Sequence, residues 1–267
     1  MSKSPSSFTA VVLAADRAPG DPVAKAAGVS CKSLTPVGGR AMVLRVLDAL
    51  GEAEEVDDIV LCGPHPSAME NEPQLGERIA SGEVKWVENQ ATPSSSAYHV
   101  LQGLPRDLPV LVTTADHALL SGPVVDFFCS EARLTGCDVV AGVASHARVA
   151  AAYPGTKRTV IKLKDGGYCG CNLFAFLSPR ARIAADHWRR VEKQRKKTLR
   201  VISTLGPVAV LRYLTGQLTL AEGLHRISQR MKLRAGVVIM PFPKAAVDVD
   251  SVEDWRLAES IVAGRTP

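Results

Sequence analysis

Short apolar runs alternate with amphipathic stretches along the first half of the chain. The runs are short for helices and rich in residues that favour strands, and they cover residues 8–15, 58–62, 84–87 and 110–114. Apolar positions at helical spacing lie between them, at 41–50 and near 67–80, 95–104 and 123–135. Strand and helix thus alternate about every twenty-five residues, which predicts βαβ units and a parallel sheet covered by helices on both faces.

The second half departs from this alternation. Three stretches have strand character with no helix expected between them, at 137–145, 159–164 and 168–177. Antiparallel pairing is therefore expected there, and the sheet is predicted to be mixed.

A mostly helical stretch follows the three strands. It covers residues 178–235, with breaks at Gly206 and Gly216, and is interpreted as a helical insert beside the core. Strand character returns at 236–240 and 245–249, before a helix that Ser251 begins. We expect one α/β domain over residues 1–267.

Composition narrows the class of protein. The chain has 267 residues, 46% of them apolar, which suits one large core. No run of eighteen uncharged apolar residues occurs and Met1–Ser7 is polar, so neither a transmembrane protein nor a secreted precursor is expected. The six cysteines lack paired C-x-x-C spacing and are expected to be free thiols of a cytoplasmic protein, with metal binding at Cys169 and Cys171 as a minor alternative.

Positive charge is concentrated in one place. Lysine plus arginine exceed aspartate plus glutamate only by 32 to 27, which does not predict nucleic-acid binding. Residues 189–200, however, hold seven basic side chains against Glu192. A phosphate contact through Arg195, Lys196 and Lys197 is one interpretation, and a solvated helix face is the other. The amphipathic residues 208–233 beside this run leave peripheral membrane contact open, although core packing explains their spacing equally well.

The first strand is followed by a candidate phosphate loop. Leu13, Ala14, Ala15, Asp16 and Arg17 leave the strand through small residues, which lets backbone N–H groups approach phosphates closely. Lys32 follows on the same long loop and supplies a cation within reach. An ordinary surface loop explains this pattern as well.

Acidic residues mark two other strand tips. Asp116 follows the strand at 110–114, and Asp248 and Asp250 lie at the end of the piece at 245–249. Ligands of such sheets bind beyond the carboxyl ends of the strands, and carboxylate oxygens suit Mg²⁺. Alternate spacing predicts that Asp248 and Asp250 point to opposite faces, so that only one of them reaches the site easily. Helix capping and turn formation are the structural alternatives for these acids.

Two further sets of polar residues are candidates. Ser94, Ser95 and Ser96 begin a helical stretch and are expected near a base or phosphate, with a helix N-cap role for at least one of them as the alternative. Asn172, after Gly170, is a candidate ligand contact or a strand-bulge residue.

Together these motifs resemble the MobA-like NTP transferase family of GT-A-type nucleotidyltransferases. The family pattern is an L-A-A-G-x-G-x-R loop, K-x-L with a following G-G, an acid at a mid-chain strand tip and a terminal D-x-D-x-x-x-D. The matching segments here are 12–15, 32–40, Asp116 and 248–254. The resemblance implies a GT-A-like, Rossmann-like fold and transfer of a nucleoside monophosphate from an NTP to a phosphorylated acceptor, with release of pyrophosphate.

Roles for individual residues follow from the resemblance. It implies that the first loop and Lys32 hold the triphosphate, that Ser94–Ser96 lie near the nucleotide, and that Asp116 and Asp250 bind Mg²⁺ or Mn²⁺. The insert, with Asn172 and residues 195–197, is expected to face the acceptor. Asp16 stands where the family usually has glycine, and its charge opposes a triphosphate unless it turns away or meets a metal.

Two other functions fit parts of the pattern. A GT-A glycosyltransferase shares the fold, but it uses a D-x-D motif with a sugar nucleotide and releases no pyrophosphate. A nucleotide-binding module without catalysis is suggested by Asp16. Sugar, alditol and amino-alcohol phosphates and molybdopterin all fit as acceptors, and the sequence does not specify the base or the oligomeric state.

Overall fold

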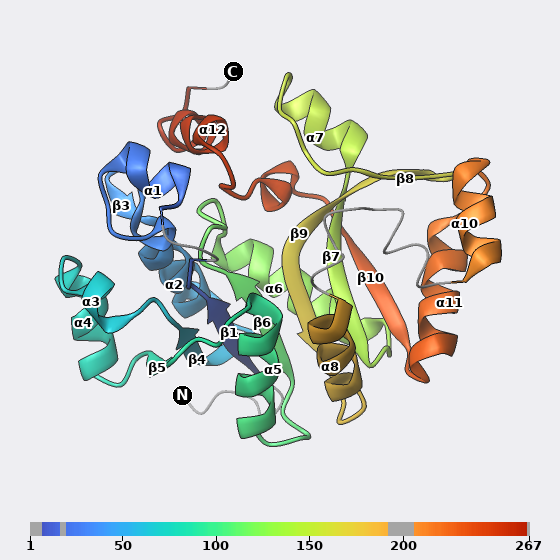
Figure 1. Ribbon diagram of the computed structural model, residues 1–267, viewed down its shortest axis with the longest axis horizontal. Coiled ribbons are helices and arrows are strands. Elements are labelled where there is room, and N and C mark those ends of the chain that lie inside the picture. Colours follow the sequence, from blue (N-terminus) through green and yellow to red (C-terminus); the bar gives the residue numbers. More distant parts are fainter. Residues whose placement is uncertain (1–6, 17–19, 192–205, 266–267) are drawn as a thin grey trace.

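The structure is a computed structural model that describes residues 7–16, 20–191 and 206–265 (Figure 1). The predicted acceptor-side residues Arg195, Lys196 and Lys197, and Arg17 of the first loop, lie outside the described residues.

A sheet that has eight strands over the described residues forms the centre of the molecule (Figure 1). Seven strands follow the order β10-β7-β9-β6-β1-β4-β5, and β8 pairs with β9. Strand β1 is parallel to β4 and β6, β4 to β5, and β10 to β7, whereas β9 is antiparallel to β6, β7 and β8. This mixed, mostly parallel sheet confirms the predicted fold class. The strands are β1 (Phe8–Leu13), β4 (Val56–Cys62), β5 (Lys85–Val87), β6 (Val110–Thr114), β7 (Val139–Ser145), β8 (Ile161–Leu163), β9 (Gly166–Phe176) and β10 (Ala235–Met240).

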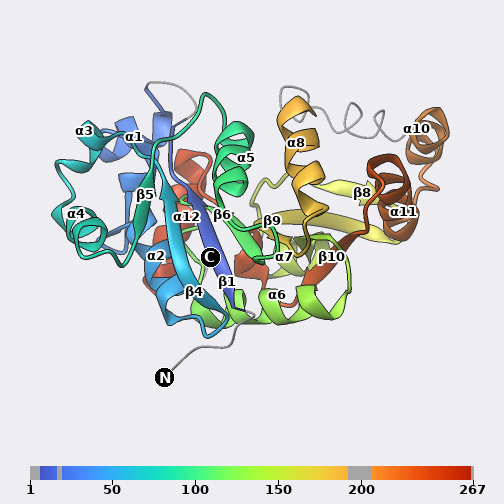
Figure 2. The same ribbon diagram turned by 90° about the horizontal axis from the view of Figure 1, so that it is seen from below.

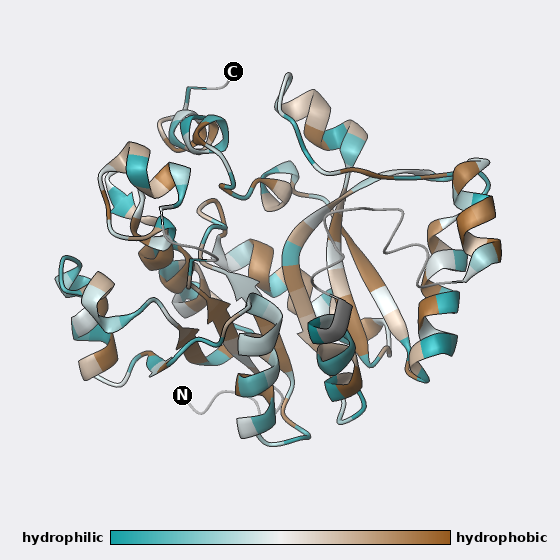
Figure 3. Cartoon of the chain, in the orientation of Figure 1, coloured by the Kyte–Doolittle hydropathy of each residue, from teal (hydrophilic) through white to brown (hydrophobic). Residues whose placement is uncertain are grey.

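Helices cover both faces of this sheet (Figure 2). Strand β1 shows why: all six of its residues are buried, and its five apolar side chains are divided between two hydrophobic clusters. Phe8, Ala10 and Val12 pack with α2 and α6, whereas Val11 and Leu13 pack with α5 and α8. Hydrophobic residues accordingly run along β1 at the centre of the molecule (Figure 3). The helices are α2 (Met42–Glu52), α5 (Pro93–Gly103), α6 (Gly122–Leu134) and α8 (Ala181–Val191).

Short helices account for several differences from the predicted elements. The stretch at 67–80 is two helices, each with a proline in its first turn. The expected long loop after β1 contains a helix capped by the Asp21 carboxylate, and a helix separates β7 from β8 where none was expected. These helices are α1 (Pro22–Ala27), α3 (Pro66–Met69), α4 (Pro73–Ala80) and α7 (His146–Ala152). A small hairpin, β2 (Pro36–Val37) and β3 (Arg40–Ala41), precedes α2.

The strand expected at 245–249 does not form. Residues Pro243–Ala246 make a 3-10 turn, which the Val247 N–H closes on the Lys244 C=O, because proline fixes φ and offers no N–H to a ladder. The chain then crosses the sheet edge as a loop to α12 (Val252–Val262). Ser251 begins that helix as predicted, since its Oγ accepts the Asp254 N–H at 3.1 Å.

The predicted helical insert contains three described helices. Helix α8 buries Ala181 and Ala185 in the core beside α5, whereas α10 (Pro207–Leu214) and α11 (Leu220–Met231) lie at the β10 side of the molecule (Figure 2). Helix α10 exposes Val208, Leu211 and Leu214. Membrane contact there stays a prediction, and within the described residues no helix is long and apolar enough to cross a bilayer.

Candidate functional site

Three segments that are distant in sequence meet at the carboxyl ends of β1 and β6. Leu13 and Thr114 are register partners at the ends of these parallel strands, and the Ala115 N–H donates to the Leu13 C=O at 3.0 Å. The loop before α12 is tied to the same edge, because the Val249 N–H donates to the Asp116 C=O at 3.0 Å. The three segments therefore meet at the edge of the sheet where ligands of parallel sheets bind.

A lysine joins the two predicted metal-binding acids at this edge of the sheet. The Lys32 Nζ lies 2.6 Å from Asp116 Oδ2 and 3.0 Å from Asp250 Oδ1. Lys32 belongs to a 3-10 helix, Lys32–Leu34, on the segment between α1 and β2. The structure thus brings together the three residues that the sequence assigned to catalysis.

The surroundings of the two acids differ. The Asp116 side chain is only 11% exposed, whereas that of Asp250 is 54% exposed. Burial raises the pKa of Asp116, but the Lys32 ammonium and its hydrogen bond outweigh burial, so the net pKa lies below the usual range. Burial likewise lowers the pKa of Lys32, and the two carboxylates reverse this to a net rise. Asp116 and Lys32 are therefore both charged at neutral pH.

Asp248 precedes Asp250 on the same loop, but its carboxylate pairs with Arg158 and Asn172, whereas that of Asp250 pairs with Lys32. Burial, and then the charges of Asp116 and Asp250, raise the pKa of Asp248 to about 6, against the opposing effect of Arg158. These residues form a loop and not the expected strand, so strand alternation is not the cause of their different partners. The Asp248 carboxylate accepts from Asn172 Nδ2 at 2.9 Å through Oδ2 and from Arg158 Nη1 at 2.9 Å through Oδ1.

Asn172 and Arg158 hold this loop from the opposite side. Asn172 has a left-handed φ of 49°, next to a break in the β7–β9 register, so it sits at the predicted bulge and still reaches the site. Whether it contacts an acceptor stays a prediction.

Sequence reasoning missed Arg158. It is 6% exposed, and its guanidinium donates to the Asp248 backbone C=O and Oδ1 and to Asp254 Oδ1. The terminal acid of the D-x-D-x-x-x-D pattern, Asp254, was a signal that a cation must lie nearby, but nothing local distinguishes Arg158 from its neighbours.

The carboxylate of Asp16 is bound to the backbone of Lys32. Both of its oxygens accept the Lys32 N–H, at 2.9 and 3.2 Å. Burial raises its pKa, and that backbone hydrogen bond opposes the rise. Asp16 thereby fixes the start of the Lys32 turn, while Ala14 and Ala15 keep the strand tip small. Gly63, after β4, completes the close packing, since a Cβ on it would lie 3.1 Å from Ala15 Cβ.

The three serines of α5 have different environments, and none is the N-cap. That role belongs to Thr92, whose Oγ1 accepts the Ser95 N–H at 3.2 Å. The alternative interpretation, in which one of the serines is the N-cap, was therefore wrong. Ser94 is buried, and Ser96 Oγ accepts the Gln90 N–H at 2.8 Å.

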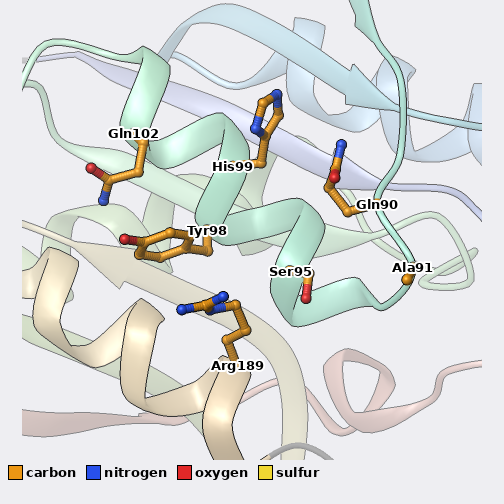
Figure 4. Close-up of a pocket in the computed structure, with 7 residues that line it drawn as sticks. All are labelled: Gln90, Ala91, Ser95, Tyr98, His99, Gln102 and Arg189. Atoms are coloured by element: carbon orange, nitrogen blue, oxygen red, sulfur yellow. The ribbon is translucent and has the colours of Figure 1, made fainter.

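Ser95 lines an open cavity of about 300 Å³ beside α5 and α8 (Figure 4). The Arg189 guanidinium there lies 4.8 Å from the centre of the Tyr98 ring. Contact of the serines with a nucleotide stays a prediction.

The carboxylates are the residues that could hold a metal ion. Asp116 is buried, and its Oδ1 has no hydrogen-bond partner among the described residues, which leaves it available as a ligand. Over the described chain, no group of three or more His, Cys, Asp or Glu side chains is arranged as a closed metal site. Two carboxylates that leave other positions to substrate and water suit Mg²⁺.

The cysteines do not form a metal site. All six lie in the described residues, and none is in a disulfide. Burial raises the pKa of Cys169 and raises that of Cys171 to about 12, so both thiols stay protonated at neutral pH.

Comparisons with known proteins agree with this geometry. A family model described as the MobA-like NTP transferase domain matches residues 10–231. A hypothetical transferase from Thermus thermophilus is similar over 93% of this chain and 99% of its own, with 28% identity and a TM-score of 0.76. No curated protein matches the sequence.

Two less similar structures share the fold. A 4-diphosphocytidyl-2C-methyl-D-erythritol synthase from Anaerococcus prevotii is similar over 97% of both chains, with 14% identity and a TM-score of 0.54. A CMP:2-keto-3-deoxy-manno-octonic acid synthetase complexed with CTP is similar over 97% of this chain and 99% of its own, with 12% identity and a TM-score of 0.58. The family model matches most of the chain, so the chain belongs to the MobA-like NTP transferase domain family and is an enzyme of the nucleotidyltransferase class.

Proposed function

We propose that this enzyme transfers a nucleoside monophosphate from an NTP to a phosphorylated small-molecule acceptor, with release of pyrophosphate and dependence on Mg²⁺ or Mn²⁺. The observation that carries the proposal is the convergence of Lys32, Asp116 and Asp250 at the carboxyl edge of the sheet. One cation and two acids are what a metal-assisted attack on a phosphate needs.

The chain's own residues divide the work. Backbone N–H groups after β1 approach the triphosphate, and the Lys32 ammonium offsets the charge that develops on the non-bridging oxygens. Asp116 and Asp250 hold the divalent ion, which when bound supplies further positive charge at the α-phosphate. An acceptor phosphate oxygen bonds to the α-phosphorus as the bond to the bridging oxygen breaks, and pyrophosphate leaves with that electron pair. No covalent enzyme intermediate forms.

The titles of the structural neighbours and the basic run at 189–200 guide which nucleotide and which acceptors to test first. The titles of two structural neighbours name cytidyl chemistry or CTP, so CTP is the first nucleotide to test. Sugar, alditol and amino-alcohol phosphates form the acceptor panel, with Asn172 and residues 195–197 on the acceptor side. Asp16 does not favour an inactive module, since its carboxylate is directed to the Lys32 N–H.

Thermal-shift screening of the four NTPs with Mg²⁺, followed by pyrophosphate release against the acceptor panel, tests the proposal. Lys32→Ala is expected to lower the rate by about 10² to 10³, and Asp116→Ala by more. Full turnover in either variant would contradict these roles. Turnover of a sugar nucleotide without pyrophosphate would instead identify a glycosyltransferase.

A further inference from the structure

Lys32 occupies the position between the two acids that a shared cation would take. Its ammonium is within 3.0 Å of a carboxylate oxygen of each, and the Lys32 side chain is only 16% exposed. One positive charge thus opposes two negative charges, so Lys32 and the two acids together have a net charge of about minus one. The Lys32 backbone is fixed separately, by Asp16, so the long side chain can change partner while its base stays in place.

A second observation at Asp116 points to another ligand. Asp116 is 9% exposed, and its Oδ1 has no hydrogen-bond partner among the described residues, although Oδ2 holds Lys32. A buried carboxylate oxygen without a donor is costly, and a cation relieves that cost. The lysine therefore satisfies this acid only in part.

We propose, building on the proposed function, that Lys32 is a tethered counter-ion that holds Asp116 and Asp250 in the nucleotide-free enzyme and transfers to the triphosphate when NTP binds. The two acids are then free for the divalent ion. The cation and the nucleotide accordingly bind with positive coupling, and the enzyme binds the metal ion weakly on its own. The coupling works in both directions, because linkage between two ligands is reciprocal.

The inference makes an unusual prediction for the catalytic lysine. Lys32→Met removes the competing positive charge, so Mn²⁺ alone is expected to bind about tenfold more tightly, within the roughly 5- to 150-fold range of ordinary coupling. In the wild type, a non-hydrolysable NTP is expected to strengthen Mn²⁺ binding, and Lys32→Met is expected to lose most of that gain. If Lys32 served only to bind phosphate, its loss would leave nucleotide-free Mn²⁺ affinity unchanged.

The test is titration of Mn²⁺ into each protein, with free ion followed by electron paramagnetic resonance. Lys85→Met is the matched control, because Lys85 is exposed on the edge strand β5, two strands away from β1, and loses the same charge. Asp116→Asn combined with Lys32→Met is expected to abolish the tight site. Circular dichroism checks folding, and Lys32→Gln replaces the methionine variant if that variant does not fold.

Unchanged or weaker Mn²⁺ binding in the Lys32 variant overturns the inference. An equal gain in Lys85→Met also overturns it, because the effect would then be one of net charge. The two proposals fail separately. If Lys32→Met binds Mn²⁺ more tightly but the wild type releases no pyrophosphate with any NTP and acceptor, the proposed function is contradicted and the counter-ion role stands. If the wild type turns over but Lys32→Met binds Mn²⁺ like the wild type, the counter-ion role is contradicted and the proposed function stands.

Discussion

Replacing Arg158 with methionine removes the cation that holds the loop carrying Asp248 and Asp250. The buried guanidinium binds the backbone and carboxylate of Asp248 and, at 2.7 Å, the carboxylate of Asp254. Asp254 in turn accepts the Ser251 hydroxyl at 2.8 Å through Oδ2. Methionine has similar length but no charge and no donors. The substitution therefore tests whether one arginine sets the position of the whole loop.

The expected cost comes from two carboxylates left without their cation. Loss of one partner of a buried ion pair costs about 3 to 5 kcal/mol. The side chains of Asp248 and Asp254 are 28% and 14% exposed, so water screens them in part and about 3 kcal/mol of unfolding free energy is expected. Displacement of Asp250 is expected to weaken Mn²⁺ binding by about 10- to 100-fold, as for other residues that orient metal ligands.

The cost depends on pH with a definite sign. Arg158 lowers the pKa of Asp248, so its removal moves that pKa further above about 6. At pH 5 the carboxyl group in the variant takes up a proton and relieves the unpaired charge, whereas at pH 8 it stays ionised. The variant is therefore expected to lose more stability at pH 8 than at pH 5.

Urea unfolding at both pH values and Mn²⁺ titration measure these effects. Arg212→Met is the matched control, because Arg212 pairs with Glu222 at the surface and should cost less than about 1 kcal/mol. The reasoning is refuted if Arg158→Met matches Arg212→Met in stability at pH 8 and binds Mn²⁺ like the wild type.

Three other variants test separate parts of the account. Burial lowers the pKa of His117 to about 4, whereas the unfolded chain takes up this proton near pH 6.5, so stability is lost as pH falls from about 6.5 to about 4. His117→Gln should therefore reduce the stability difference between pH 7 and pH 5 by about 2 kcal/mol in urea titrations. Asp16→Asn keeps an acceptor for the Lys32 N–H but removes a charge near the phosphates, and should lower KM for NTP about fivefold in steady-state assays. An unchanged KM would mean that this charge is already screened. Glutamine at Arg195, Lys196 and Lys197 should raise KM for the acceptor and leave that for NTP nearly constant, whereas equal weakening of both would remove their acceptor role.

Hydrophobic pattern was enough to predict the sheet and its main helices. Strand β1 is buried on both faces and is therefore a continuous apolar run, whereas α2 is buried on one face and has apolar residues at helical spacing. Both patterns are visible in the sequence. The pattern failed at 245–249, where Ala245, Ala246 and Val247 are buried by tertiary packing although the backbone forms a turn. Short helices such as α7 were missed because seven residues carry too few turns for a period to show.

The site was predictable only where family motifs mark it. Lys32, Asp116 and Asp250 each belong to such a motif, and their convergence depends on parallel strands that end at one edge. Arg158 belongs to no motif, and its role arises from contacts 90 and 96 residues away in sequence. Tertiary partners of that kind have no local signal.

The most direct test of the central claim is a double-mutant cycle on Asp116 and Asp250, measured as Mg²⁺-dependent pyrophosphate release. If both acids hold one ion, Asp116→Asn and Asp250→Asn should each lower kcat/KM strongly. The kcat/KM of the double variant should then be only slightly below that of the less active single variant. Losses that multiply in the double variant would show that the two carboxylates act independently, and would contradict the account.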